Sequence, residues 1–145
     1  MSTKFPRSCY DKTGGLVYFP RMLDKIRLHA ASALGKDYLE NLGGGFDARC
    51  CSFLGVKYDD LKKQVLAGAS DEAALQWCFE HGRMPSTDEI TELNEFLLRR
   101  GWRDTATPRL HMRLKEAKLE HRIGEILTMF DFIEVDEGRT PPKFP

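Results

Sequence analysis

The sequence predicts an all-α fold, an irregular bundle of six to seven short helices in a single domain spanning residues 1–145. Apolar residues recur at three- and four-residue spacing in one segment after another, and most of these segments end at a glycine. Strict alternation of apolar and polar residues, which would predict strands, is absent. Because the connections are short, consecutive helices are expected to pack as neighbours.

The first helix is expected to begin at Pro20, after an extended N-terminal segment over residues 1–15. Proline suits a first helical position because the N–H that it lacks would have no partner there. Gly35 is expected to end this helix. Its apolar stripe consists of Met22, Leu23, Ile26, Ala30, Ala33 and Leu34.

Three helices are expected in the middle of the chain, over residues 47–54, 59–67 and 71–81, after a short helical turn at 37–42. Ser70 is a suitable N-cap for the third of them. That helix is apolar around most of its circumference, so we expect it at the centre of the core.

The C-terminal part begins with a capping box, Ser86 and Glu89, before a helix that Gly101 ends. The pair Thr107-Pro108 predicts the start of the next helix, whose apolar face runs as far as His121. A last helix is expected over 122–134, although Gly124 weakens it by roughly 1 kcal/mol relative to alanine. Trp102 is expected to pack on Leu97, and residues 138–145 to form an extended, proline-rich tail.

The composition is that of an ordinary globular protein, with 41% hydrophobic and 30% charged residues among 145. A chain of this length buries enough surface to fold without a metal or a disulfide. No cofactor is expected. No apolar run reaches the length of a membrane span, and no signal peptide is recognised. The four cysteines form no CxxC pair, which is typical of reduced thiols in a cytoplasmic protein.

The net charge is zero, but the charges are unevenly distributed along the chain. Residues 1–68 carry 11 basic and 7 acidic side chains, and residues 69–145 carry 11 and 15. The two halves could attract each other within one molecule or between subunits. A zero total argues against a nucleic-acid partner, because such a protein needs a basic face.

Several stretches together resemble a known family. They are Gly15-Leu16-Val17-Tyr18 with residues 20–29, Phe46-Asp47-Ala48-Arg49-Cys50-Cys51, Gly101-Trp102-Arg103-Asp104, and Phe130-Asp131-Phe132-Ile133 with Asp136-Glu137-Gly138-Arg139. The chain resembles, from about residue 7 to 139, a family of small bacterial proteins known only as a domain of unknown function. The resemblance implies a bacterial, intracellular, single-domain protein, and it implies no substrate, cofactor or catalytic residue.

The polar face of the first helix is the first candidate site. Arg21, Asp24 and Lys25 share it, and His29 lies at its edge. Basic groups beside a carboxylate and an imidazole could bind an anion and transfer a proton. The alternative, which we favour, is a solvated face with an ion pair between Arg21 and Asp24.

A glycine run before a helix, Gly43-Gly44-Gly45, is a second candidate, because such loops can offer backbone N–H groups to a phosphate. Arg49 follows it and could join Arg21 and Lys25 around an anion. The spacing is not that of a known phosphate loop, and Asp47 would repel an anion. A helix C-cap at Gly43 explains the run more simply.

The thiols are further candidates. Cys50 is expected in the core, whereas Cys51 points elsewhere and is the plausible nucleophile. Cys78 and His81, at i,i+3, could hold a metal, but no second pair supplies the remaining ligands. We therefore expect no metal site, with Cys78 in the core and His81 at a helix end.

Two charged clusters are further candidate sites. Trp102 among Arg99, Arg100 and Arg103 could stack a nucleic-acid base, but these arginines also suit a helix C-terminus. The acidic residues Glu134, Asp136 and Glu137 lack the spacing of a calcium loop, and a solvated tail is favoured.

Two functions of different class follow. The favoured one is a non-catalytic binding or interaction module, forming a homo-oligomer through exposed apolar residues such as Phe132 and Met112. The alternative is a small enzyme or sensor that binds an anionic metabolite through Arg21, Lys25 and Arg49. Asp24 or His29 would then handle protons, and Cys51 would be the nucleophile. The sequence names no partner and leaves catalysis open.

Overall fold

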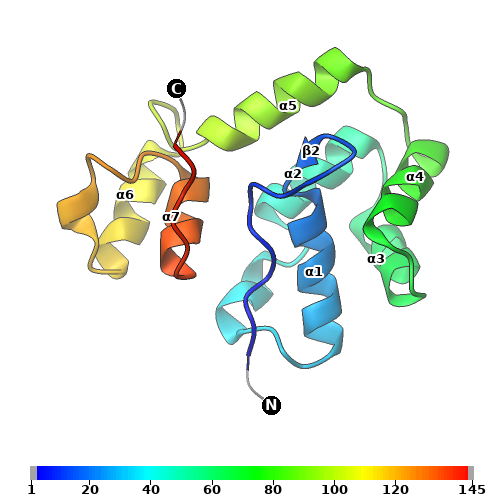
Figure 1. Ribbon diagram of the computed structural model, residues 1–145, viewed down its shortest axis with the longest axis horizontal. Coiled ribbons are helices and arrows are strands. Elements are labelled where there is room, and N and C mark those ends of the chain that lie inside the picture. Colours follow the sequence, from blue (N-terminus) through cyan, green and yellow to red (C-terminus); the bar gives the residue numbers. More distant parts are fainter. Residues whose placement is uncertain (1–2, 144–145) are drawn as a thin grey trace. The chain divides into compact units, whose positions relative to one another are not determined.

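The computed structural model describes residues 3–143 and confirms the all-α class (Figure 1). These residues form seven α-helices, two 3-10 helices and one two-stranded hairpin. The chain divides into two compact units, residues 1–91 and 92–145, and each is described by itself. The division falls inside helix α5, Thr87–Arg99. That the whole chain forms one domain stays a prediction.

Unit 1 is built around α1, which contacts α3, α4 and the hairpin (Figure 1). Met22, Leu23 and Ile26 on α1 are buried, as the apolar stripe predicts, whereas Ala30 at the end of the helix is exposed. The elements of this unit before α5 are β1 (Lys12–Thr13), β2 (Leu16–Val17), α1 (Phe19–Ala30), η1 (Lys36–Asn41), α2 (Gly45–Leu54), α3 (Tyr58–Leu66) and α4 (Asp71–His81).

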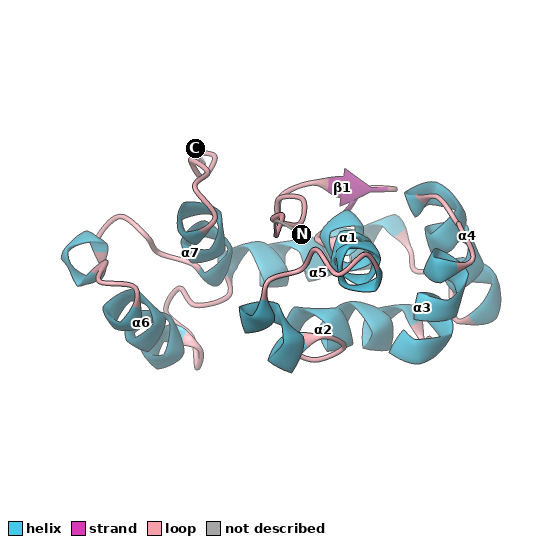
Figure 2. Cartoon of the chain, turned by 90° about the horizontal axis from the view of Figure 1, so that it is seen from below, coloured by secondary structure: helices cyan, strands magenta, loops and turns pink. Residues whose placement is uncertain are grey.

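The hairpin is a feature that the sequence reading missed. Lys12 pairs with Val17 and Thr13 with Leu16 around Gly14-Gly15, both of which have positive φ. Two glycines at positive φ form the tight turn that joins antiparallel strands. Strands of two residues are too short to show an alternating pattern, so periodicity could not reveal them. Strand β1 lies against both α1 and α4 (Figure 2).

Helix α1 ends at Ala30, earlier than the expected stop at Gly35. Ser32 takes the left-handed conformation, and the Ala33 N–H donates to Leu28 O at 2.8 Å. These features form a Schellman motif without glycine. Ala33 and Leu34 are still buried, because the chain folds back there and Lys4 bridges to Leu34.

Helix α4 does not occupy the centre of the core, contrary to expectation. It buries Ala74, Leu75 and Cys78, while Trp77 and Phe79 are only half-buried. One face of α4 therefore packs on the unit, and aromatic residues cover its flanks. Its N-terminus is as expected, since Ser70 Oγ accepts the Ala73 N–H at 3.1 Å.

Unit 2 contains the rest of α5, α6 (Thr107–Glu116), η2 (Glu120–Arg122) and α7 (Met129–Asp136). Its core cluster is Leu110, Leu114, Ile126 and Phe132. Helix α6 contacts both α7 and η2 (Figure 1). Phe132, read from the sequence as an exposed interface residue, is buried in this cluster.

The last helix differs from the expected one over 122–134. Lys118, at φ 60°, ends the preceding helix, and residues around Gly124 form a turn rather than a helix. Thr128 then caps α7 by accepting the Asp131 N–H. The tail has neither helix nor strand as far as Lys143, and residues 144–145 of the expected tail, like residues 1–2, lie outside the described residues.

No helix in residues 3–143 is long and apolar enough to cross a membrane.

Candidate functional site

A buried polar cluster joins α1 to α2 and contains several of the candidate residues or their neighbours. We call Tyr18, Lys25 and Asp47 the α1–α2 cluster. Lys25 Nζ lies 2.8 Å from Asp47 Oδ1 and donates to the Tyr18 hydroxyl at 2.9 Å. The Tyr18 hydroxyl in turn donates to Asp47 Oδ1 at 2.7 Å. All three residues are buried, with Asp47 fully so.

Local structure places each member of the cluster. Tyr18 precedes α1 in the left-handed conformation, φ 71°, which is rare for an aromatic residue. Asp47 lies in the first turn of α2, where its other oxygen, Oδ2, accepts the Gly43 N–H at 3.0 Å. The Tyr18 ring also packs against Phe46, with centroids 5.5 Å apart. The cluster therefore holds the N-terminal end of α1 against the N-terminal end of α2.

The polar groups of the α1–α2 cluster bind one another in the interior of unit 1. Burial, with the negative charge of Asp47 next, raises the pKa of Tyr18 well above its ordinary value of 10.0. The phenol therefore stays protonated at neutral pH and acts as a hydrogen-bond donor. Asp47 accepts from three donors, which supplies the partners that a buried carboxylate needs. The favoured reading of the α1 polar face as solvated is wrong for Arg21 and Lys25, which are 3% and 4% exposed.

Arg21 and Asp24 both bind the backbone of Arg7. The Arg21 guanidinium donates to Arg7 O at 3.0 Å and lies over the Tyr38 ring. Asp24 Oδ2 accepts the Arg7 N–H at 3.0 Å. Both side chains therefore hold the N-terminal segment against α1.

The residues of the expected anion site differ in exposure. Arg21 and Lys25 are buried and have the partners just described, whereas His29 and Arg49 are exposed. The Lys25 ammonium in particular is already paired with Asp47. The roles proposed for Arg21, Asp24, Lys25, His29 and Arg49 in binding or proton transfer stay predictions, and this geometry does not favour them.

All four thiols are free and buried. Burial, with the nearby charge of Asp47 next, raises the pKa of Cys51 from 9.0 to about 12. Burial likewise raises the pKa of Cys50 above its ordinary value and that of Cys78 to about 12. Cys51, which we expected to be the more exposed thiol, is 4% exposed and lies 3.9 Å from the Met22 sulfur. A thiol with a raised pKa is a poor nucleophile, because the thiolate is the reactive form.

Cys78 and His81 lie in different environments. Cys78 is in the core, whereas His81 is exposed and stacks on Trp77 with ring centroids 4.8 Å apart. His81 Nδ1 donates to Trp77 O at 3.0 Å. Within residues 3–143, no group of three or more His, Cys, Asp or Glu side chains is arranged to hold a metal ion.

Of the three acidic residues expected in a solvated tail near the C-terminus, only Asp136 is exposed. Glu134 and Glu137 are buried, and Arg139 pairs with both, at 3.8 Å and 2.5 Å. The sequence reading missed this pairing because Arg139 lies beyond the end of α7, where periodicity carries no information.

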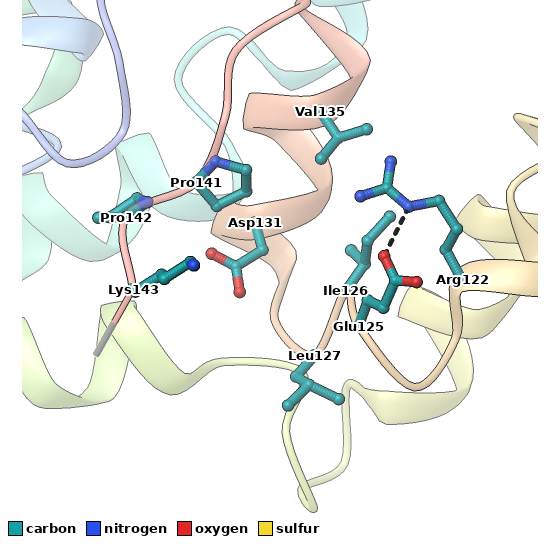
Figure 3. Close-up of a pocket in the computed structure, with 9 residues that line it drawn as sticks. All are labelled: Arg122, Glu125, Ile126, Leu127, Asp131, Val135, Pro141, Pro142 and Lys143. Carbon is teal, nitrogen blue, oxygen red and sulfur yellow. Dashed lines mark hydrogen bonds and ion pairs between the residues drawn. The ribbon is translucent and has the colours of Figure 1, made fainter. Parts of the chain in front are cut away.

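A shallow groove lies in unit 2, with a volume of about 510 Å³. The buried side chain of Ile126 and the half-buried Val135 form part of its apolar surface, and Arg122 points toward them from one side (Figure 3). Arg122 is oriented by Glu125, whose Oε2 accepts from Arg122 Nε at 3.0 Å. The groove is lined by Arg122, Glu125, Ile126, Leu127, Asp131, Val135, Pro141, Pro142 and Lys143. Of the basic residues that the sequence offers as a nucleic-acid site, Arg122 lies in this groove.

The connection between α5 and α6 is a tightly hydrogen-bonded turn, residues 101–107, which we call the Trp102 turn. Asp104 Oδ2 accepts the Gly101 N–H at 2.9 Å, and its Oδ1 accepts the Ala106 N–H at 2.8 Å. The Thr107 hydroxyl accepts the Asp104 N–H and donates to Gly101 O at 2.8 Å. Helix α6 begins at Thr107, as the pair Thr107-Pro108 predicts, although the N-cap is Ala106. The Thr107 hydroxyl instead holds the turn closed.

Trp102 at this turn is 46% exposed, and the Arg103 guanidinium lies 5.5 Å from its ring centroid. The expected packing of Trp102 on Leu97 stays a prediction. The neighbouring arginines are engaged by acids, Arg99 by Glu95 and Arg100 by Asp104.

Comparison with known proteins identifies the family. The family model described as "Domain of unknown function (DUF5069)" matches residues 3–139, which is nearly the whole chain. The chain belongs to this family. No curated protein matches it. The family supplies no activity, so the function is argued from the geometry.

Sequence reasoning found the residues of the site more readily than their arrangement. The sequence indicates Lys25 as part of a solvated face and Asp47 only as a charge that would repel an anion. It gives no role to the Tyr18 hydroxyl. The one signal in the sequence is the position of Lys25, one turn after Arg21 on a helix with a buried apolar stripe. Spacing alone does not distinguish a buried ion pair from a solvated one.

Proposed function

We propose that this protein is a non-catalytic interaction module whose binding surface lies in unit 2. The supporting observation is the distribution of exposed apolar side chains. Nine large hydrophobic residues are exposed among the described residues, and five of them come from unit 2, the smaller unit. The five are Phe96, Trp102, Met112, Ile123 and Leu127. Exposed apolar side chains that lie together mark an interaction site, and their larger share in unit 2 supports placing the site there.

The pairing and burial of the chemically reactive side chains also support a non-catalytic function. The polar side chains most suited to catalysis, Lys25, Asp47 and Tyr18, bind one another inside unit 1. The thiols are buried, and three of them have raised pKa values. These groups are committed to the stability of the unit, and the alternative function as an enzyme or sensor of an anionic metabolite loses its support.

Self-association is the first form of interaction to test, and we infer that apolar contacts would drive it. The opposite charges of residues 1–68 and 69–145 do not coincide with the two units. Divided at residues 91 and 92, each unit contains equal numbers of acidic and basic residues. Net charge therefore gives the units no general attraction, whereas Met112 and Ile123 offer apolar area.

The cellular location proposed here is the cytoplasm. Four free thiols, all buried and none joined in a disulfide, suit a reducing compartment. The bacterial origin implied by the family resemblance is part of the same proposal.

Sedimentation velocity on the full chain tests the proposed self-association. The wild type is expected to sediment as an oligomer at micromolar concentration, and Met112→Glu and Ile123→Glu to shift it to monomer, because a charge in an apolar interface loses its hydration. Leu66→Glu, at an exposed apolar position of α3 in unit 1, is the matched control and should leave the oligomer intact. A wild type that stays monomeric across this range would contradict self-association.

A further inference from the structure

The Trp102 turn is constructed to hold its tip in one conformation. Besides the Asp104 and Thr107 hydrogen bonds, the Trp102 N–H donates to Arg99 O at 2.9 Å. Arg100 O accepts the Met129 N–H at 2.8 Å, which ties the start of the turn to α7. Gly101 has φ 101°, and a Cβ there would lie 3.1 Å from Met129 N. The turn therefore presents Trp102 and Arg103 on a preorganised backbone.

At the tip of the turn, Trp102 is exposed and Arg103 carries a positive charge. Trp102 is nearly half exposed, and Arg103 stacks over it while adopting the left-handed conformation, φ 50°. This conformation is unfavourable for a residue other than glycine, and the surrounding hydrogen bonds hold it. Unlike Arg99 and Arg100, Arg103 has no acidic partner in residues 3–143. The tip therefore offers an aromatic surface and one cation, both already positioned.

We propose that the Trp102 turn binds a protein partner through a short segment that places a carboxylate beside an apolar side chain. The carboxylate would pair with Arg103, and the apolar side chain would pack on Trp102. Tryptophan and arginine are the residue types most enriched among interface positions that dominate binding. A rigid turn favours binding because little further conformational freedom is lost. The inference rests on the proposed function and names the partner's chemistry.

The charges around the turn favour an acidic protein segment over a nucleic acid. A nucleic-acid site needs several cations to neutralise successive phosphates. Here Glu95 engages Arg99 and Asp104 engages Arg100, and unit 2 as a whole has no excess of positive charge. Arg103 supplies one cation and Trp102 one exposed aromatic surface. A protein segment with one carboxylate beside one apolar side chain complements this pair.

Peptide display on the immobilised full-length protein tests this inference. A random peptide library is selected on the wild type, and the enriched peptides are then measured against Trp102→Ala and Arg103→Asn. Asparagine is chosen because it tolerates the left-handed backbone that Arg103 adopts. We expect Asp or Glu next to an apolar residue to be enriched, and each substitution to weaken binding by about tenfold or more. Leu66→Ala and Arg109→Gln, which alter an exposed apolar residue and an exposed arginine elsewhere, should change binding little.

Other outcomes separate failure of this inference from failure of the proposed function. Peptides that bind Trp102→Ala as tightly as the wild type would place the binding surface elsewhere and overturn the assignment to this turn. Tighter binding of a single-stranded oligonucleotide than of any selected peptide would also overturn it. If Trp102→Ala dissociates an oligomer, the turn is the contact between copies and the heterologous partner is excluded. No enriched peptide in a protein that is also monomeric would overturn both proposals.

Discussion

The buried ion pair between Lys25 and Asp47 shows how context changes the meaning of a residue. A lysine on an amphipathic helix usually extends into water, and an aspartate in the first turn of a helix usually serves the helix N-terminus. Here the two residues meet 2.8 Å apart in the interior of unit 1 and share the Tyr18 hydroxyl. A pair of this kind gives weak net stabilisation, but its disruption is costly because the remaining charge stays buried.

Replacing one member of the pair should therefore destabilise the protein strongly. Asp47→Asn leaves the Lys25 ammonium without its counter-charge, and the free energy of unfolding should fall by about 3–5 kcal/mol. Urea denaturation measures this change. Asp60→Asn, at an exposed position in the first turn of α3, is the control and should cost less than about 1 kcal/mol. The double variant Lys25→Met Asp47→Asn should lose less than the sum of the single losses, and strict additivity would show that the pair is not coupled.

The thiols give a prediction about pH. Because the folded state raises the pKa of Cys51 and Cys78 from 9.0 to about 12, it favours the protonated thiol. This contribution to stability is fully present below about pH 9 and is lost as pH rises from there toward 12. At pH 8 a thiol reagent should react slowly with the folded protein and rapidly with all four cysteines in urea. Rapid reaction of one thiol in the native protein would mean that Cys51 is an accessible nucleophile after all.

At the scale of helices and loops, the main errors of sequence reading occurred where helices end without glycine. Ser32 and Lys118 occupy the left-handed position after α1 and α6, although α1 was expected to run to Gly35 and the apolar face of α6 to His121. The Ala33 N–H then donates to Leu28 O, and the Leu119 N–H to Leu114 O, as in a Schellman motif. Helices that end at glycine, such as α2 at Gly55, were placed to within two residues. A helix end is predictable from sequence when its residue type is distinctive, and it is hidden otherwise.

Gly82 joins the C-terminal ends of α2 and α4, and it should not tolerate a side chain. A Cβ at this position would lie 2.0 Å from Leu54 O, a backbone atom that also accepts the Arg83 N–H at 2.9 Å. Gly82→Ala should therefore reduce the free energy of unfolding by about 1–3 kcal/mol, measured by urea denaturation. Gly124→Ala is the matched control, because no atom lies within 4 Å of its added Cβ, and it should be neutral or slightly stabilising. Equal effects of the two variants would refute the close approach at Gly82.

The Trp102 turn should depend on the ionised form of Asp104. Partial burial by itself raises the pKa of Asp104, but the N–H donors of Gly101 and Ala106 and the charge of Arg100 outweigh it and hold the pKa below 3.8. The turn therefore gains stability above pH 3.8, and the gain is lost as pH falls through the lower, folded value. Asp104→Asn removes one acceptor and should cost about 1–2 kcal/mol at pH 7.

Thermal unfolding at pH 7 and at low pH measures the role of Asp104. Glu116→Gln, which alters an exposed acid of α6 with a long ion-pair distance of 3.8 Å, is the control. The difference in stability between wild type and Asp104→Asn should shrink on acidification. A constant difference would show that the charge of Asp104 does not hold the turn.

For the whole molecule, composition and periodicity were sufficient for the fold class but not for its internal arrangement. The apolar stripe of α1, the capping box at Ser86 and Glu89, and the burial of Cys50 could all be predicted from spacing. The hairpin could not, because its strands are two residues long. The α1–α2 cluster depends on contacts between residues 29 positions apart, such as Tyr18 and Asp47, which local patterns do not contain.

The same contrast separates the two proposed functions. Candidate catalytic residues were chosen because their types are chemically versatile, and the structure uses Lys25, Asp47 and Arg21 to hold unit 1 together. Unit 2, by contrast, carries five of the nine exposed large apolar side chains among residues 3–143, two of which, Phe96 and Trp102, also lie beneath arginines of the same unit. This difference between the units carries the claim that the protein acts by binding another macromolecule.

Native mass spectrometry of the full chain as purified, compared with its denatured mass, tests that claim most directly. We predict an oligomer, or a complex with a protein partner, whose mass is accounted for by polypeptide alone. A monomer carrying a stoichiometric small anion would contradict the claim, because it would mean that Arg21, Asp24 and His29 or another polar site binds a metabolite. In that case Arg21→Gln and His29→Gln would be the first variants to measure for loss of the added mass.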